Sequence, residues 1–365
     1  MANDKKIRVG ITQGDTNGIG WEVIIKALSH DMMTDLCTPV LYGSSKVFAY
    51  HRKAIDMQQH FSANVIKSIG DLKEGAVNLI DVVTEEVKVE LGELGKQAGQ
   101  AAFKALEAAV SDLQAGNIDV LVTAPINKDN MQSDQFHFTG HTDYLEATCG
   151  EGSKAMMVMC AGALRVALVT IHVPLAQVAG ALTKELIVER LHTFDASLRR
   201  DFGLERPRIA VLGLNPHAGE NGLLGSEEQD IIVPAIEQAY DEHVLAFGPY
   251  AADGFFGHEQ WQRFDGVLAM YHDQGLTPFK TIARNGGVNF TAGLPIVRTS
   301  PDHGTGYDIV GKNVAEPASM RQAIYAAIDI CRNRASHDQA TAAPLGKLYE
   351  TRGRDNVVLD LTKEA

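Results

Sequence analysis

At 365 residues the chain is long enough for two domains and a sizeable hydrophobic core. Its composition of 45% hydrophobic and 22% charged residues is ordinary for a globular protein, and its net charge of −13 excludes the basic footprint of non-specific nucleic-acid binding. That charge does not exclude an anionic substrate, because cations placed locally decide whether a small anion binds.

The cysteines and the N-terminus bear on the compartment. Cys37, Cys149, Cys160 and Cys331 are scattered without a C-x-x-C pair, which predicts reduced, mostly buried thiols in a cytoplasmic protein. The first residues run straight into a strand with no preceding apolar segment, so we expect no signal peptide. No apolar stretch approaches the ~18–20 residues that a membrane span needs.

The first elements form a strand, a glycine turn and a helix. Residues 7–12 alternate as a strand does, residues 14–20 hold three glycines, and residues 21–28 have a helical pattern. This order is typical of a phosphate cradle, but the spacing G-x-x-x-G-x-G matches neither the dinucleotide fingerprint nor the P-loop. A tight structural turn and a ligand loop therefore both remain open.

Strands and helices alternate through most of the remaining chain. Strands are predicted at residues 38–42, 118–124, 156–160, 164–173 and 208–214, and helices at residues 97–116, 184–202, 227–240 and 318–331. The motif F-T-G-H-T-D-Y-L at residues 138–145 sets a donor-rich turn before a helix, whose N–H groups suit an anion. The alternation predicts an α/β architecture with mainly parallel sheets in two lobes.

Three histidines follow buried strands in the same way. His172 follows V-A-L-V-T-I, His217 follows I-A-V-L-G-L-N-P, and His272 follows V-L-A-M-Y. A lone histidine is more often a hydrogen-bonded structural residue than a ligand. Three in matching settings, on one rim of a parallel sheet, fit a catalytic divalent-metal site with an open position. Their spacing alone does not establish that they converge.

Further polar residues lie in the segment around His272, among apolar and glycine-rich sequence. Arg298 and Lys280 are expected to pair with an oxyanion, since a partly buried cation without a partner is costly. Asn289, beside two glycines, is either a ligand contact or a turn residue. Asp253 in A-A-D-G either orients a metal ligand or caps a turn.

Several long motifs together give the chain a family resemblance. I-T-Q-G-D, F-T-G-H-T-D-Y-L, L-N-P-H-A-G-E, M-Y-H-D-Q-G and G-L-P-I-V-R-T-S-P-D-H-G-T are spread over nearly the whole sequence. With them the chain resembles the 4-hydroxythreonine-4-phosphate dehydrogenase family of vitamin B6 biosynthesis. It departs from the pattern at residues 15–21, D-T-N-G-I-G-W, where many members carry two prolines.

The resemblance implies two α/β/α domains around a central cleft, related to the isocitrate and isopropylmalate dehydrogenases. One domain would hold residues 1–125 and 300–365 on the NAD side. Residues 126–299 would form the other, with the metal, the substrate and the interface of a homodimer. By family pattern the metal ligands would be His172, His217 and His272, one of them supplied by the other subunit. Substrate would be held by His141, Thr142, Lys280, Asn289 and Arg298.

The implied cofactors are NAD, with NADP as the alternative, and one divalent ion per site, zinc, magnesium or cobalt. The segment at residues 303–313 is similar to the NAD-adenosine loop of isopropylmalate dehydrogenases, so His303, Gly304, Thr305 and Asp308 would lie near the nucleotide. The reaction implied is oxidation of 4-phosphohydroxy-L-threonine to a 3-oxo acid that loses CO2. The general base stays open among His141, Lys280 and Asp253.

Two other functions remain. A dehydrogenase of 4-phosphothreonate or 4-phosphoerythronate would share the phosphate, metal and NAD residues. A phosphate acyltransferase, of a related fold, would need no metal histidines, so dependence on a divalent ion separates it from the dehydrogenases.

Overall fold

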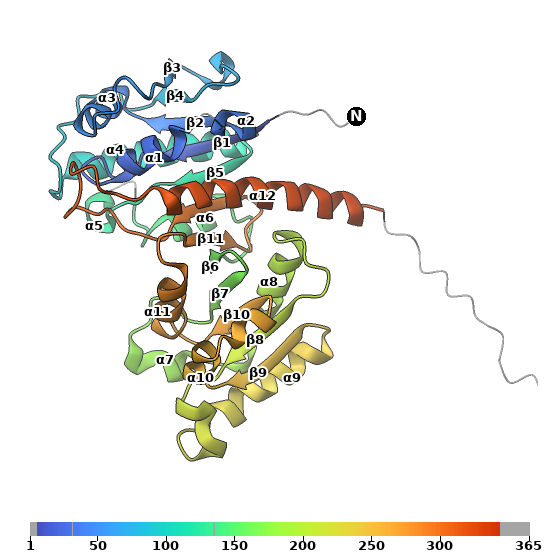
Figure 1. Ribbon diagram of the computed structural model, residues 1–365. Coiled ribbons are helices and arrows are strands. Elements are labelled where there is room, and N and C mark those ends of the chain that lie inside the picture. Colours follow the sequence, from blue (N-terminus) through green and yellow to red (C-terminus); the bar gives the residue numbers. More distant parts are fainter. Residues whose placement is uncertain (1–5, 31, 134–135, 344–365) are drawn as a thin grey trace, which may run out of the picture.

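The computed structural model describes residues 6–30, 32–133 and 136–343 of the chain (Figure 1). Its strands are β1 (Ile7–Thr12), β2 (Cys37–Gly43), β3 (Asn64–Ile66), β4 (Asn78–Asp81), β5 (Val120–Thr123), β6 (Met156–Ala161), β7 (Leu164–Leu168), β8 (Arg208–Leu212), β9 (Leu245–Tyr250), β10 (Gly266–Ala269), β11 (Val288–Ala292) and β12 (Arg298–Pro301). Its α-helices are α1 (Gly20–Leu28), α2 (Met33–Leu36), α3 (Ser45–Ala54), α4 (Lys96–Gln114), α5 (Lys128–Met131), α6 (His141–Cys149), α7 (Leu175–Ala181), α8 (Lys184–Arg200), α9 (Val233–Asp241), α10 (Ala252–Gly257), α11 (His272–Ala283) and α12 (Ala318–Thr341). Shorter turns are η1 (Ile69–Asp71), η2 (Pro216–Gly222), η3 (Glu228–Ile232) and η4 (Gln260–Arg263).

The strands of the described residues form one continuous sheet. Their order is β3-β4-β2-β1-β5-β12-β11-β6-β7-β10-β8-β9. Neighbours pair in parallel, except where β11 meets β12 and β6 and where β6 meets β7. These three reversals make the parallel block that ends at β12 run opposite to the block that begins at β7. The predicted α/β architecture with mainly parallel strands is confirmed, and its two halves appear above and below the waist in Figure 1.

The two faces of the sheet are packed differently. On one face, α1, α8, α9 and α12 contribute to a single hydrophobic cluster that extends across both halves of the sheet. On the other face there are two separate clusters, one built with α4 and α6 and the other with α10 and α11. A sheet buried on both sides needs the near-continuous apolar strands that the sequence has. The interruption lies on the second face only, between α6 and α11.

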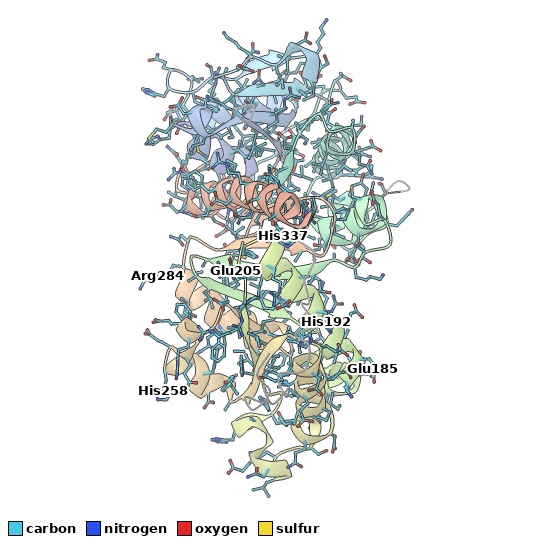
Figure 2. All side chains as sticks on the ribbon, turned by 90° about the vertical axis from the view of Figure 1, so that its right-hand side faces the viewer. Glu185, His192, Glu205, His258, Arg284 and His337 are labelled. Carbon is cyan, nitrogen blue, oxygen red and sulfur yellow. The ribbon has the colours of Figure 1, made fainter. Side chains whose placement is uncertain are left out.

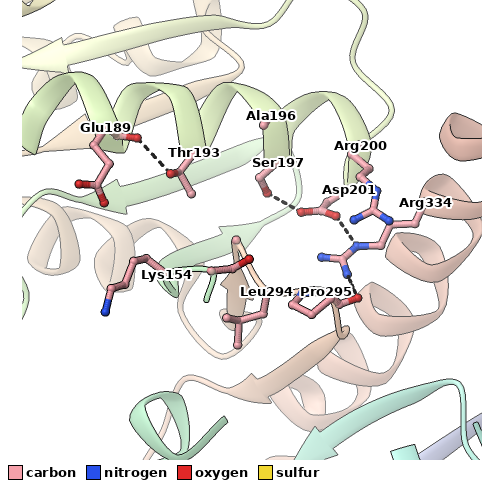
Figure 3. A pocket seen from close by; sticks show the side chains of 12 residues that line it. Lys154, Glu189, Thr193, Ala196, Ser197, Arg200, Asp201, Leu294, Pro295 and Arg334 are labelled. Atoms are coloured by element: carbon pink, nitrogen blue, oxygen red, sulfur yellow. Dashed lines mark hydrogen bonds and ion pairs between the residues drawn. The ribbon is translucent and has the colours of Figure 1, made fainter. Parts of the chain in front are cut away.

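Helix α12 joins the two halves on the continuous face. It runs to Thr341, ten residues beyond the predicted end, because Arg334 near its C-terminal end is held inside the protein. The Arg334 guanidinium donates to the Asp201 carboxylate at 2.6 Å and to the carbonyls of Pro295 and Ile296 at 2.9 and 3.0 Å. Figure 3 shows this ion pair at one end of a cavity between α8 and α12. His337, which also lies on α12, is labelled in Figure 2 near the boundary between the two halves.

The predicted burial of most of the cysteines agrees with the structure. Cys37, Cys149 and Cys160 are buried, Cys331 is partly exposed, and all four are free thiols. Burial raises the pKa of Cys37 and of Cys160 to about 12, which keeps both thiols protonated and unreactive.

Two sequence expectations concern the outline of the molecule. Within the described residues no helix combines the length and apolar character that crossing a bilayer requires. The division into residues 1–125 plus 300–365 and residues 126–299 stays a prediction, and its ends at residues 1–5 and 344–365 lie outside the described residues. Helix α5 packs directly against α4, and α6 belongs to the same hydrophobic cluster as α4. Both helices lie in the upper half of Figure 1.

The tie between α12 and α8 is expected to matter for stability. Arg334→Met leaves the Asp201 carboxylate buried without its cation, so the free energy of unfolding should fall by about 3–5 kcal/mol. Denaturant unfolding measures this change. Arg200→Met, which breaks the exposed pair with Asp338, is the matched control and should cost no more than about 1 kcal/mol. Equal effects of the two variants would contradict the structural role of Arg334.

Candidate active site

The strands that precede the three histidines are neighbours in the sheet. Strand β10 pairs in parallel with β7 on one side and with β8 on the other. The carboxyl ends of the three strands therefore lie on one rim, as the sequence predicts, and His172, His217 and His272 follow these ends. Such rims are where open α/β sheets bind their ligands.

A cavity of about 290 Å³ lies on the interrupted face, between the two separate hydrophobic clusters. Its walls come from the segment after β5, the start of α6, one side of α11, and β6, β11 and β12. Most of the predicted site residues line it: His141, Thr142, His172, His272, Lys280, Asn289, Arg298, His303 and Gly304. Residues from across the sequence thus converge where the packing leaves a gap.

Arg298 sets the electrostatics of this cavity. Only 3% of the residue is exposed, and its guanidinium is bonded to the hydroxyls of Thr123 and Thr291, at 2.6 to 3.1 Å. Among the described residues it has no carboxylate partner, and its burial lowers its pKa to about 10. A guanidinium buried without a counter-ion is costly unless an anion pairs with it. The cavity therefore favours an anionic ligand.

His141 at the start of α6 faces the same cavity. Burial lowers its pKa well below the usual range, and the charges of Arg298 and Lys128 lower it further. The ring is thus neutral, and its Nε2 atom is buried with no hydrogen-bond partner among the residues that the structure describes. The side-chain oxygen of Asn289 and Nε2 of His303, in the same cavity wall, are also buried and unpartnered. Buried polar atoms left without partners by the protein indicate a ligand that bonds to them.

His172 and His272 lie side by side at the cavity edge. Their ring centroids are 6.3 Å apart, and Nδ1 of His272 lies 2.7 Å from the Asp273 carboxylate. Burial, together with the charges of Lys128 and His272, lowers the pKa of His172. A neutral imidazole is the form that binds a metal ion, and a carboxylate bonded to the other ring nitrogen is the usual support of such a ligand.

His217 does not join this pair within one chain. It lines a neighbouring cavity of about 610 Å³ together with Asp253, Tyr271 and Asp273. In the described part of the chain no three histidine, cysteine, aspartate or glutamate side chains gather closely enough to hold a metal ion. The structure therefore brings together two of the three predicted ligands and leaves His217 on an adjacent surface of the same rim.

The turn that carries His217 has a left-handed backbone. Positive φ angles of 44° to 82° occur at five successive positions: His217, Ala218, Gly219, Glu220 and Asn221. For an L-residue the left-handed helical conformation costs roughly 1–2 kcal/mol. Other contacts must hold the turn in place, and such backbone strain is characteristic of functional segments.

The glycine turn after β1 is a structural element. Residues 11–20 are all buried, and the Asp15 carboxylate accepts hydrogen bonds from Asn130 at 2.7 Å and Tyr307 at 2.8 Å. The Ile19 N–H donates to the Thr305 carbonyl at 2.8 Å. The turn is therefore occupied by the protein's own segments rather than open to a phosphate. It fixes the position of the segment at residues 303–313, of which His303 and Gly304 line the cavity and Thr305 and Asp308 do not.

One residue of the site was missed by the sequence analysis. Lys128 lines the cavity and lowers the pKa of both His141 and His172. The signal was present, because Lys128 comes five residues after the end of β5, in the strand-end position that singled out the histidines. The strand predicted from the sequence ended at Ala124, and no role was assigned to Lys128.

Substitution of Arg298 should separate binding from folding. In Arg298→Met the lost hydrogen bonds are offset by the lost burial of a charge, so the free energy of unfolding should change by no more than about 1 kcal/mol. Inorganic phosphate should raise the melting temperature of the unaltered protein and not that of the variant. Lys154→Met, at an exposed lysine outside this cavity, should keep the phosphate effect. A phosphate effect retained in Arg298→Met would contradict the assignment of the anion site.

Comparison with known proteins identifies the family of the chain. The family profile described as "Pyridoxal phosphate biosynthetic protein PdxA" matches residues 35–327. A curated 4-hydroxythreonine-4-phosphate dehydrogenase of Bacteroides thetaiotaomicron is 52% identical over 358 residues, 98% of each chain. An Oceanobacillus iheyensis protein provisionally named D-threonate 4-phosphate dehydrogenase is 37% identical over 328 residues, 89% of this chain and 98% of that one.

A solved structure extends the agreement to the fold. The 4-hydroxythreonine-4-phosphate dehydrogenase of Klebsiella pneumoniae superposes with a TM-score of 0.75 at 34% identity, covering 90% of this chain and 100% of the other. Both the profile and the relatives span most of the sequence, including the segments that line the cavity. The chain therefore belongs to the pyridoxal phosphate biosynthetic protein PdxA family and is an oxidoreductase of the dehydrogenase type.

Proposed function

We propose that the protein oxidises 4-phosphohydroxy-L-threonine, with NAD and a divalent metal ion, to 2-amino-3-oxo-4-phosphooxybutanoate. This product then decarboxylates to 3-amino-2-oxopropyl phosphate. The single observation that carries the proposal is the buried Arg298 guanidinium, which has no carboxylate partner within the described part of the chain. Its cavity is also lined by Lys280, Lys128 and two histidines that lie side by side. An anionic, phosphorylated hydroxy acid supplies the charge that this cavity lacks.

The phosphate would bind in the part of the cavity that Arg298 and the start of α6 line. Arg298 offers charge-assisted hydrogen bonds there, and the first turn of α6, with His141 and Thr142, offers N–H groups at the positive end of a helix. Lys280, whose ammonium donates to the Asp302 carbonyl at 3.2 Å, would add a mobile positive charge. Asn289 would meet the substrate with its unpartnered side-chain oxygen, which accepts a hydrogen bond from a hydroxyl or amino group.

The metal ligands would be His172, His217 and His272, and the ion zinc, magnesium or cobalt. The donor chemistry fits, because His172 is kept neutral and the Asp273 carboxylate supports His272. When bound, the ion supplies Lewis acidity that favours deprotonation of the substrate hydroxyl and stabilises developing negative charge. Because His217 faces a different cavity from the other two, we propose that the site is completed in a homodimer, with one histidine from the other subunit.

NAD, or NADP as the alternative, would bind beside His303, Gly304, Thr305 and Asp308. His303 has an unpartnered Nε2 atom in the cavity wall, and Gly304 next to it is exposed. The general base remains among His141, Lys280 and Asp253. Of these, His141 and Lys280 line the main cavity, whereas Asp253 lies with His217. The low pKa of His141 makes it a weak base and a suitable neutral hydrogen-bonding partner for the substrate.

A second candidate is a dehydrogenase of 4-phosphothreonate or 4-phosphoerythronate. The observation that favours it is the similarity to the Oceanobacillus iheyensis relative, whose provisional name contains D-threonate 4-phosphate. Phosphate, metal and NAD contacts would be the same for both substrate classes. A phosphate acyltransferase is the third candidate, and it gives the paired histidines no role.

NADH formation from purified protein distinguishes these candidates. With 4-phosphohydroxy-L-threonine we expect turnover that a chelator abolishes and that a divalent ion restores. Turnover of 4-phosphothreonate or 4-phosphoerythronate alone would move the protein to the second candidate. Acyl transfer to phosphate without metal dependence would support the third and overturn the proposed dehydrogenase reaction.

Sharing of the metal site can be tested by complementation. His217→Ala and His272→Ala should each be inactive alone, because each removes a ligand. In randomly mixed dimers one of the two sites in each heterodimer keeps all of its ligands, so up to about a quarter of the original activity should return. Mixing after unfolding and refolding ensures subunit exchange. A mixture that stays inactive would contradict a site built from two subunits.

A further inference from the structure

We infer that Glu228 is a positioning residue that holds the left-handed turn of His217 in its metal-binding conformation. The inference rests on the proposed role of His217 as a metal ligand and concerns a residue that does not line the cavity of Arg298. Glu228 is 3% exposed, and it has no partner among the ion pairs of the described residues. A buried carboxylate needs several hydrogen-bond donors, and here all of the donors named below come from the strand end before His217.

The contacts of Glu228 are concentrated on two successive residues. Its Oε1 atom accepts hydrogen bonds from the backbone N–H groups of Leu214 and Asn215, each at 2.7 Å. Its Oε2 atom accepts from Nδ2 of Asn215 at 2.9 Å. The same Nδ2 atom also donates to Oε2 of Glu227 at 2.7 Å, so Glu228 shares the Asn215 side chain with its neighbour. The backbone bonds at Leu214 and Asn215, where the chain leaves β8 and enters the turn, are made by Glu228. His217 is two residues further on.

The turn is also shaped to fit this carboxylate. At Gly219, where φ is +82°, a Cβ atom would lie 2.6 Å from Oε2 of Glu228. Any side chain at this position would therefore displace the carboxylate or the turn. Glu228 itself begins η3, a short π-helical segment that precedes α9. Such wide turns inside helices often mark functional positions.

A second contact links this strand end to the strand end of His272. Gln274 donates from Nε2 to the Gly213 carbonyl at 2.6 Å and accepts from the Met270 N–H at 2.7 Å. Glu228 and Gln274 therefore hold residues 213–215 from two directions. Glu228 connects the His217 turn to α9, and Gln274 connects it to α11, the helix that begins with His272. The two histidine-bearing loops share one supported backbone segment.

Substitution of Glu228 by glutamine tests the inference. In Glu228→Gln an amide NH2 replaces one acceptor oxygen and opposes a donor, so the turn should lose its geometry. We expect the affinity for Co²⁺, followed by the visible absorption of the bound ion, to fall roughly 10–100-fold with an altered spectrum. Stabilisation by inorganic phosphate, which depends on Arg298, should be retained in the same variant. Glu237→Gln, at an exposed glutamate of α9, is the matched control and should bind Co²⁺ normally.

Two results would overturn the inference: unchanged Co²⁺ affinity and spectrum in Glu228→Gln, or parallel loss of the phosphate and Co²⁺ responses. If this variant does not fold, Glu228→Asp gives the same test, because the shorter side chain keeps the charge but withdraws the carboxylate from the N–H groups of Leu214 and Asn215. His217→Ala separates the inference from the proposed function. Normal Co²⁺ binding in His217→Ala would show that His217 is not a ligand. If Co²⁺ binding is lost in His217→Ala but kept in Glu228→Gln, only the role of Glu228 is rejected.

Discussion

The burial of an uncompensated guanidinium in the middle of the sheet is the constraint on which the site depends. Arg298 begins β12. Among the described residues, the side chains that hydrogen-bond to its guanidinium are two threonines, Thr123 of β5 and Thr291 of β11. Burial lowers the pKa of His141, the charge of Arg298 lowers it further, and the cavity that both residues line has room for an anion. The hydrophobic core around the sheet offsets the free energy lost by desolvating this charge, as it commonly does for binding sites that are themselves destabilising.

Much of the fold could be predicted because its elements are long and strongly patterned. The helices near residues 97–116 and 184–202 were found almost within their bounds, since their apolar faces repeat with helical spacing. The length of α12 was underestimated, because its last turns are held by the buried pair of Arg334 and Asp201 and by an exposed pair of Arg200 and Asp338. Contacts between residues more than a hundred positions apart leave no local periodicity in the sequence. The single continuous sheet was missed for the same reason.

The candidate site divides in a similar way. Residues at strand ends and in apolar surroundings, such as His172 and Arg298, could be singled out because polar groups there are unusual. The adjacency of His172 and His272 follows from the parallel pairing of β7 and β10. The sequence predicted that both histidines lie on one rim, but not that their strands are neighbours. The separation of His217 does not, because it depends on a left-handed turn and on the hydrogen bonds of Glu228, whose sequence context is that of an ordinary helix start. The neutrality of His141 depends on burial, which only the folded chain defines.

The unequal packing of the two faces has a mechanical consequence. The hydrophobic cluster that contains α1, α8, α9 and α12 crosses the boundary between the halves, whereas the clusters around α4 and α11 stop on either side of the cavity. Bending about the central strands β12 and β11 would widen or narrow the cavity while the shared core stayed packed. The motion that side-chain packing opposes least is therefore the one that changes the volume available to a bound anion.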